Sequence, residues 1–260
     1  MTRLARRVPI LAYHSIAQGR PPLCVSPARF GEHLWSLRDA GWSALTLDEL
    51  LAGHAGGGWP ERRVMFTFDD GLASFAREAL PQLVRVGFSA ILFVVAGRMG
   101  GESDWPGWPR SAPTERLIDE VALAEVAAAG VEIGAHAMTH RRLATLDAEA
   151  AVREVIDSRH RLEDMASRLV RSFAYPFGEV TPAVARLVRE QFEAGFGIRL
   201  AYATPRSRRE AFERIDAHYL RNRRSLARLS TPGTRAYLAL RAVPREARRA
   251  LTSTATAPSS

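Results

Sequence analysis

The sequence predicts an α/β fold, a (β/α) barrel of up to eight strands that closes imperfectly. Short apolar runs alternate with stretches of helical spacing, and 260 residues can bury one large core. Polar residues follow several of the apolar runs directly. Because the carboxyl ends of the strands share one face of such a barrel, these polar residues are expected to form one site.

The expected strands and helices alternate between residues 8 and 220. Apolar and β-branched runs predict the strands, and N-cap residues followed by apolar residues at helical spacing predict the helices. The expected strands are Val8–Tyr13, Trp42–Leu47, Val64–Phe68, Ser89–Val95, Val131–Ala135, Ser172–Tyr175, Gly195–Ile198 and Ile215–Tyr219. The expected helices are Ser26–Ala40, Thr46–Ala52, Leu72–Leu83, Thr114–Ala129, Asp147–Leu169 and Pro182–Phe192, and a long loop is expected over Gly97–Pro113.

The composition is that of an ordinary soluble globular protein with a basic charge. Hydrophobic residues make up 47% of the chain, and the net charge of +8 comes from arginine, because the sequence contains no lysine. No nucleic-acid recognition motif accompanies this charge, so nucleic-acid binding is not expected. Cys24 is the one cysteine, which excludes an internal disulfide. The first apolar run, Val8–Tyr13, is too short for a secretory leader, so a cytoplasmic location is expected.

Two adjacent acids, Asp69 and Asp70, follow the expected strand Val64–Phe68, and Gly71 permits a sharp turn after them. Adjacent carboxylates repel each other, so the pair indicates a bound cation or a shared catalytic task. On these residues alone, a solvated strand end that caps the next helix is an equal alternative.

His136 and His140 lie four residues apart, directly after the expected strand Val131–Ala135. Two imidazoles and one carboxylate, with further positions open to water, are a common catalytic zinc set. One acid of the doublet would then neutralise the metal, and its neighbour would take a proton from water. This chemistry fits hydrolysis of a carbonyl or acyl bond, and the turn Pro176–Gly178 offers a backbone N–H for the oxyanion.

Together these motifs resemble the polysaccharide deacetylases, carbohydrate esterase family 4 with the NodB homology domain. The resemblance rests on the runs TFDDG at Thr67–Gly71, HAMTH at His136–His140 and FAYPFG at Phe173–Gly178. It implies a distorted (β/α) barrel of seven or eight strands, NodB-type, and removal of N-acetyl groups from amino sugars. It also implies a divalent metal, which we expect to be Zn.

The resemblance implies a role for each matching residue. Asp69 resembles the general base, and the residues that resemble metal ligands are Asp70, His136 and His140. Phe177 stands where the family often has tyrosine, and its backbone N–H is still available to bind the oxyanion.

The N-terminal run Pro9–Ile16 is similar to the subgroup that deacetylates poly-N-acetylglucosamine exopolysaccharides. This similarity implies that His14 is the general acid; the alternative is a core histidine at a strand end. Two positions depart from the family pattern. Ala137 replaces a common Ser or Thr, and Ala174 replaces an arginine that pairs with the catalytic aspartate in many members, so Arg214 is a candidate for the missing guanidinium.

Trp105, Trp108 and Tyr175 are the candidate substrate-binding residues. The two tryptophans lie in the long loop on the catalytic side, and aromatic rings stack well on the apolar faces of sugars. They are equally suited to anchoring a proline-rich loop on the barrel.

The pattern changes after residue 220. Residues 1–220 are expected to form the deacetylase-like domain, and residues 221–260 an Arg-rich extension that is partly disordered, above all over Thr252–Ser260. Arg221–Arg249 contains nine arginines and one acid. This excess indicates either a solvated helix or contact with an anionic membrane surface or a phosphate-bearing substrate carrier.

These observations predict a cytoplasmic, metal-dependent N-deacetylase. Its expected substrate is a polysaccharide that contains N-acetylglucosamine, or the polyprenyl-linked precursor of an exopolysaccharide, adhesin, biofilm or holdfast polymer. Two alternatives remain open. One is an inactive glycan-binding module on the same fold, suggested by Ala137 and Ala174, and the other is a metal-dependent amidase of another small substrate.

Overall fold

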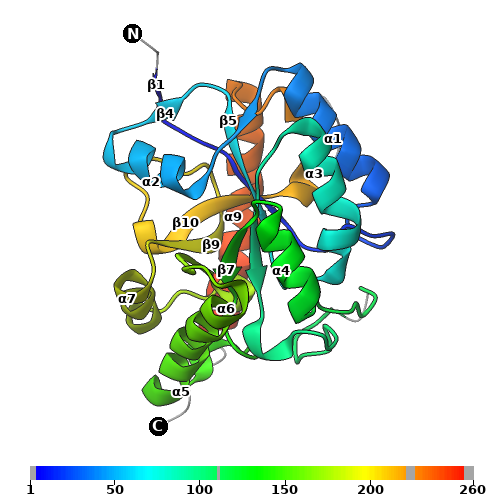
Figure 1. Ribbon diagram of the computed structural model, residues 1–260. Helices are drawn as coiled ribbons and strands as arrows, with labels where there is room; N and C mark the ends of the chain where they lie inside the picture. The colour runs from blue at the N-terminus through cyan, green and yellow to red at the C-terminus, as the bar shows by residue number, and fades with distance from the viewer. Residues whose placement is uncertain (1–3, 110–111, 221–225, 255–260) are drawn as a thin grey trace.

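The computed structural model describes residues 4–109, 112–220 and 226–254, and it shows a closed barrel of seven parallel strands surrounded by helices (Figure 1). In order around the barrel the strands are β2 (Ile10–Tyr13), β10 (Phe212–Asp216), β9 (Ala194–Leu200), β8 (Ser172–Ala174), β7 (Glu132–Ala135), β6 (Ile91–Val94) and β5 (Arg63–Phe68). Strand β2 pairs with both β10 and β5, which closes the ring. A short strand β3 (Ser43–Ala44) adds to β5 outside it. The predicted NodB-type barrel is confirmed.

The remaining elements connect and cover these strands. Strands β1 (Leu4–Ala5) and β4 (Trp59–Pro60) form a small antiparallel pair. The described α-helices are α1 (Pro27–Asp39), α2 (Leu47–Ala55), α3 (Leu80–Val86), α4 (Glu120–Ala128), α5 (Ala148–Val152), α6 (Ser158–Ala166), α7 (Pro182–Gln191) and α9 (Pro232–Thr254). The described π- and 3₁₀-turns are η1 (Phe75–Ala79), η2 (Ala96–Arg98), η3 (Leu143–Thr145), η4 (Arg153–Asp157), η5 (Pro176–Gly178), η6 (Arg209–Ala211) and η7 (Ala217–Tyr219).

Two predicted helix starts are confirmed by their caps. The Ser26 hydroxyl accepts the N–H of Arg29 at the start of α1. At the start of α2, Thr46 and Glu49 each accept a backbone N–H of the other, a reciprocal capping box. These caps satisfy N–H groups that have no partner within the helix, so a local sequence signal suffices to place the helix start.

The predicted helix over 114–129 is wrong in its first part, because α4 begins only at Glu120. Asp119 accepts the N–H of Ala122 and caps the helix there. The residues before it are extended, and Leu117 bridges to Leu72 beside the doublet. The predicted last strand is likewise displaced, since β10 spans Phe212–Asp216 and a 3₁₀-turn follows it.

Successive side chains of a strand point to opposite sides, so each barrel strand has one set that faces the helices and one that faces the barrel interior. On β5, Val64, Phe66 and Phe68 pack outward against the helices, whereas Met65 belongs to a cluster drawn from six of the barrel strands. Thr67 and Asp69 continue this inward series. The period of two therefore directs one acid of the doublet into the barrel mouth.

The C-terminal helix α9 runs behind the barrel in the view of Figure 1 and packs against β9. Leu238 of this helix and the preceding Leu226 and Leu229 are buried in the main core cluster. The domain boundary at residue 220 stays a prediction, and most of the tail expected to be disordered lies outside the described residues. Within the described part of the chain, no helix has the length and apolarity needed to cross a bilayer.

Candidate active site

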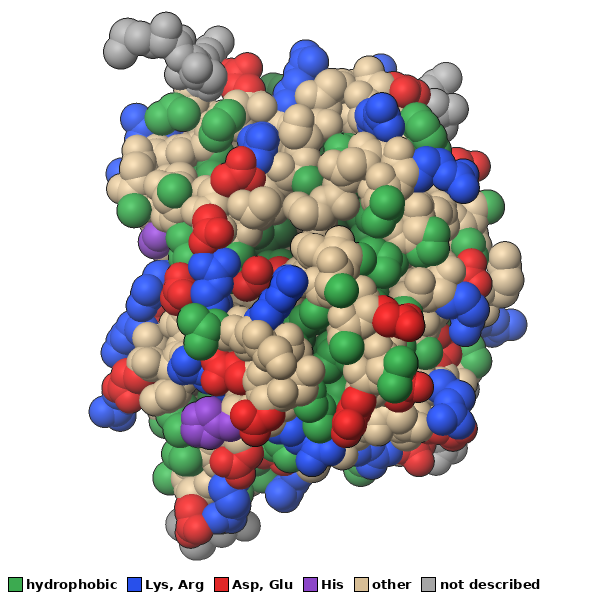
Figure 2. Space-filling view, in the orientation of Figure 1, with side chains coloured by type: hydrophobic (Ala, Val, Ile, Leu, Met, Phe, Trp, Pro, Cys, Tyr) green, Lys and Arg blue, Asp and Glu red, His purple; other side chains and the backbone are tan. Residues whose placement is uncertain are grey.

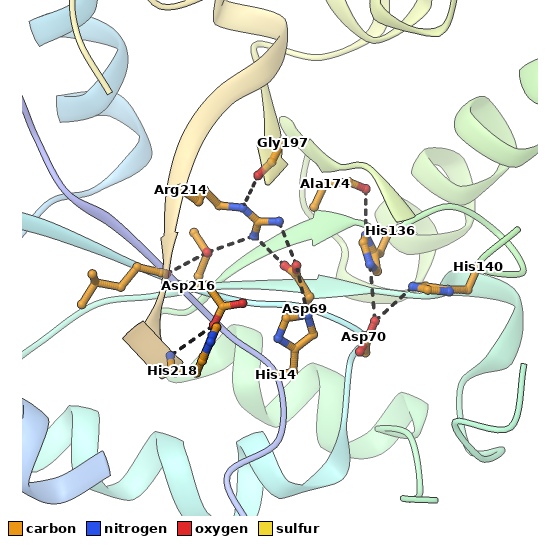
Figure 3. Close-up of polar contacts among 12 residues, drawn as sticks. His14, Asp69, Asp70, His136, His140, Ala174, Gly197, Arg214, Asp216 and His218 are labelled. Atoms are coloured by element: carbon orange, nitrogen blue, oxygen red, sulfur yellow. Dashed lines mark hydrogen bonds and ion pairs between the residues drawn. The ribbon is translucent and has the colours of Figure 1, made fainter. Parts of the chain in front are cut away.

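Asp70, His136 and His140 form the centre of the site, as predicted. Their ligand atoms all lie within 4.8 Å of one another, and the three side chains are buried. Asp70 Oδ1 is 3.4 Å from His136 Nε2 and 3.2 Å from His140 Nε2 (Figure 3). One carboxylate and two imidazoles that converge in this way fit a divalent metal ion.

A backbone contact orients one of these ligands. His136 Nδ1 lies 2.7 Å from the carbonyl oxygen of Ala174. Because a carbonyl can only accept, Nδ1 carries a proton here, and Nε2 is the nitrogen that faces Asp70. A second hydrogen bond of this kind is the usual way in which proteins fix a metal-binding imidazole.

The backbone around the site is held in an uncommon conformation. Asp70, Ala137, His140 and Phe177 have positive φ angles of 73°, 63°, 59° and 56°. Gly71 also has a φ of 67°, and a Cβ there would lie 3.2 Å from Val94 Cα. Non-glycine residues at positive φ cost about 1–3 kcal/mol each and persist where the surrounding structure enforces them, often at functional sites.

Asp69 is held by Arg214, which supplies the guanidinium that Ala174 does not. Arg214 Nη1 and Nη2 lie 2.7 and 2.8 Å from the two carboxylate oxygens of Asp69. Arg214 also donates to the carbonyl of Gly197 at 2.8 Å and to the Thr67 hydroxyl at 3.1 Å. Burial raises the pKa of Asp69, but the guanidinium more than offsets this and holds that pKa below its usual range.

His14 lies on the other side of Asp69. Its Nε2 is 3.8 Å from Asp69 Oδ2, and 21% of the side chain is exposed. Figure 3 shows Asp69 between His14 and Arg214, while Asp70 faces the two metal-site histidines. The predicted asymmetry of the doublet is therefore visible in the geometry, although the chemical roles of these residues stay predictions.

The metal-site residues influence one another's charge. Burial raises the pKa of Asp70, but hydrogen bonds from His136 and His140 outweigh it and hold that pKa well below its usual range. Burial lowers the pKa of His136, and the contact with Asp70 reverses the direction, so its net pKa is raised. For His140 burial prevails and the pKa is lowered.

These side chains open into a cavity of about 230 Å³ with apolar walls. The predicted substrate residues all line this cavity, but they differ in how much of each side chain is already engaged by other protein groups. Trp105 is buried with its ring stacked on that of His140, centroid to centroid 4.3 Å, so it supports a metal-site residue. Trp108 is half-buried, and its indole N–H has no acceptor among the described residues. The Tyr175 hydroxyl donates to the carbonyl of Glu210 at 2.6 Å, so only its ring faces the cavity.

Phe177 also lines the cavity, where it packs against the cluster that contains Trp105. Its ring meets that of His140 edge-on at 4.8 Å, and the Arg142 guanidinium covers it at 4.3 Å. The turn that carries Phe177 lies beside the metal cluster, which is compatible with the predicted role of its backbone N–H.

Among the residues that line the cavity, sequence reasoning missed a charged one, Asp216. It follows Arg214 by two positions on β10, accepts the backbone N–H of His218 at 3.1 Å and lines the cavity beside His14. The signal that could have found it is its place at a strand end, in the same inward series as Arg214.

Residues 56–194 match the family model of the polysaccharide deacetylases. The chain belongs to this family. The matched region contains the doublet, both metal-site histidines and the turn at Phe177, whereas His14 and Arg214 lie outside it.

Among curated proteins, this deacetylase-family chain is 28% identical over 178 residues to YxkH of Bacillus subtilis, whose provisional name is that of a polysaccharide deacetylase. The match covers 68% of this chain, and the chain spans 59% of the length of YxkH.

Two solved structures share the fold. The deacetylase PplD of Streptococcus pyogenes, in complex with acetate, superimposes with a TM-score of 0.70 at 22% identity over 80% of this chain and 91% of its own. IcaB of Ammonifex degensii gives a TM-score of 0.70 at 24% identity over 82% and 92%.

Proposed function

We propose that this protein is a metal-dependent hydrolase that removes N-acetyl groups from N-acetylglucosamine-containing polysaccharide or its lipid-linked precursor. One observation carries the proposal: a buried Asp-His-His cluster stands next to a second carboxylate, Asp69, which Arg214 holds apart from the cluster. A ligand set and a separately held base in one cavity are what hydrolysis of an unactivated amide requires.

The residues divide the work as follows. Asp70, His136 and His140 would hold the ion, for which we propose Zn. When bound, a divalent cation supplies Lewis acidity that activates water and polarises the acetamide carbonyl. Asp69 accepts a proton from the attacking water; the low pKa that Arg214 gives it keeps it ionised at neutral pH.

His14 and Phe177 act on the other atoms of the amide. The C–N bond breaks to give acetate and an amine, and His14 donates the proton that the departing nitrogen needs. Its Nε2 lies 3.8 Å from Asp69 Oδ2, so both proton-transferring groups face the same small volume. The Phe177 backbone N–H donates to the oxyanion.

The cavity supports an acetamido sugar as substrate. Its volume of about 230 Å³ and its apolar walls suit a methyl group and one face of a pyranose ring. The ring of Trp108 lines the cavity, and its buried indole N–H has no acceptor among the described residues, so it would be a donor for a sugar hydroxyl that reaches it. The acetate bound by PplD and the shared fold of a de-N-acetylase from Aggregatibacter actinomycetemcomitans support the same chemistry.

We also propose that α9 contacts an anionic membrane surface, where a lipid-linked glycan would be found. Tyr237, Leu240 and Val243 are 41%, 73% and 65% exposed, and they recur every three residues on the helix while Leu238 faces the barrel. An apolar stripe on an arginine-rich helix suits such a surface. On the face shown in Figure 2, acidic and basic side chains are interspersed, so the net charge does not gather there.

Release of acetate from N-acetylglucosamine oligomers tests the enzymatic proposal. We expect the wild type to release acetate, and Asp69→Asn and a chelator each to abolish the release. Metal analysis of the purified protein separates an inactive glycan-binding module from an enzyme, and a panel of acetylated peptides and cyclic amides separates an amidase from a sugar deacetylase. Turnover that persists in Asp69→Asn contradicts its role as base.

A further inference from the structure

The loop that carries both metal-site histidines is strained. Within His136–His140, Ala137 and His140 both adopt left-handed backbone conformations. Such conformations are unfavourable for residues other than glycine, so contacts with the rest of the molecule must hold the loop in this shape. Ala137 is itself buried and has no side-chain hydroxyl with which to brace the loop.

Two carbonyl groups of the loop accept hydrogen bonds from the η2 turn beside it. The N–H groups of Ala96 and Gly97 donate to the carbonyls of Ala137 and Met138 at 3.1 and 2.8 Å. These two bonds position the middle of the loop from one side only.

The N–H groups of the loop converge on a single side chain, Glu154. Its Oε2 accepts the backbone N–H of Met138 at 3.0 Å and that of Thr139 at 2.9 Å. The Thr139 hydroxyl donates to its Oε1. The backbone carbonyl oxygen of Glu154 also accepts the Met138 N–H, at 3.1 Å. One carboxylate thus gathers three donors from two consecutive loop residues.

The surroundings of Glu154 show that its charge is directed at this loop. The side chain is buried, and no salt bridge joins it to an arginine or histidine in the described parts of the chain. It lies in η4, a π-turn between α5 and α6; such widened turns are frequent at functional sites. Hydrogen bonds to a charged acceptor are roughly twice as strong as neutral ones, so the loop provides the compensation that a buried carboxylate needs.

We propose that Glu154 is a positioning residue for the metal site: it holds the His136–His140 loop in the conformation that brings both imidazoles to Asp70. The inference rests on the proposed metal-dependent function for the presence of an ion, but it concerns the affinity of the site for the ion. It assigns to the η4 turn a role in metal binding that no motif in the sequence indicates.

The test compares Glu154→Ala with a matched control, Glu163→Ala. Glu163 lies on the following helix, where it accepts the N–H of Val170 at 3.0 Å and pairs with Arg159, far along the chain from the metal loop. The Kd of metal-free protein for Zn²⁺ is measured by competition with a chromophoric chelator. Hydrogen exchange of the Met138 and Thr139 amides and thermal unfolding are followed in the same samples.

We expect Glu154→Ala to raise the Kd for Zn²⁺ about 10- to 100-fold, the usual effect of removing a group that orients metal ligands. The two loop amides should lose protection from exchange. Glu163→Ala should lower the unfolding temperature yet keep the Kd within about twofold, because the two sites share no partner. Glu154→Gln retains an acceptor oxygen without the charge, so its Kd should lie between those of the wild type and Glu154→Ala.

A folded Glu154→Ala or Glu154→Gln variant with the wild-type Kd overturns the proposal, and so does a Glu163→Ala variant whose Kd rises as much. Acetate release is not part of the measurement. If Glu154→Ala weakens Zn²⁺ binding but the wild type deacetylates nothing, the positioning role is supported and the proposed function is contradicted. If the wild type is active and Glu154→Ala has the wild-type Kd, the proposed function is supported and the positioning role is contradicted.

Discussion

Replacing Arg214 by methionine should destabilise the protein by several kcal/mol. The side chain is 1% exposed and donates four hydrogen bonds, two of them to Asp69. Arg214→Met leaves a buried carboxylate without its partner, which costs about 3–5 kcal/mol. The same loss is expected for Asp69→Asn, because a buried guanidinium is then left without its counter-charge.

A double-mutant cycle measures this pair directly. The variant that combines Asp69→Asn with Arg214→Met buries no unpaired charge, so it should cost no more than either single variant, giving a coupling energy of about 3 kcal/mol or more. Urea unfolding of the metal-free proteins provides the free energies. As a control, Arg153→Met removes an exposed pair with Glu149 and should cost about 0.5 kcal/mol or less. Additive single costs for Asp69 and Arg214 would refute the argument.

Four further predictions concern His14, for which we propose a catalytic role, the cavity, a buried histidine and α9. His14→Gln should lower kcat for acetate release about 10²- to 10⁴-fold and leave the Kd for Zn²⁺ unchanged, as kinetics and metal titration would show. Trp108→Phe keeps an aromatic ring but removes the indole N–H, so KM should rise about fivefold with kcat unchanged. Burial, with a smaller contribution from Arg29, lowers the pKa of His33 to about 4, so urea unfolding should show about 2 kcal/mol less stability at pH 5 than at pH 7. Leu240→Ser should weaken binding to phosphatidylglycerol vesicles about tenfold in a flotation assay.

The pH prediction has a definite sign. The folded-state pKa of His33 is lower than the unfolded value, so its contribution is fully present above about pH 6.5 and is lost as the pH falls towards 4. The free energy of unfolding of His33→Gln should therefore fall less between pH 7 and pH 5 than that of the wild type. An equal fall in both proteins would contradict the prediction. For the vesicle assay, Val84→Ser is the matched control, since Val84 is 61% exposed on α3. If Leu240→Ser and Val84→Ser weaken vesicle binding equally, α9 is not the membrane contact.

Local patterns in the sequence determined the strand ends and the metal cluster. An apolar run followed by TFDDG specifies a buried strand that ends in two acids, and HAMTH after a second such run specifies two imidazoles at another strand end. In a parallel barrel these ends must meet on one face, so Asp70, His136 and His140 could be placed together without knowing the full topology. The capped starts of α1 and α2 were equally predictable, whereas the cap of α4 at Asp119 was missed.

Only the tertiary structure decided which side chains support these groups. Arg214 reaches Asp69 from β10 although β2 lies between β10 and β5, because inward-facing residues meet across the barrel interior. Trp105 packs on His140, and Glu154 binds the metal loop from a π-turn. The sequence offered Arg214 as a candidate partner of Asp69 and Trp105 as a substrate residue, but nothing in it indicated that Trp105 supports His140 or that Glu154 contacts the loop. Local sequence motifs therefore specify the reacting groups. The side chains that hold these groups in place depend on which elements become neighbours when the barrel closes.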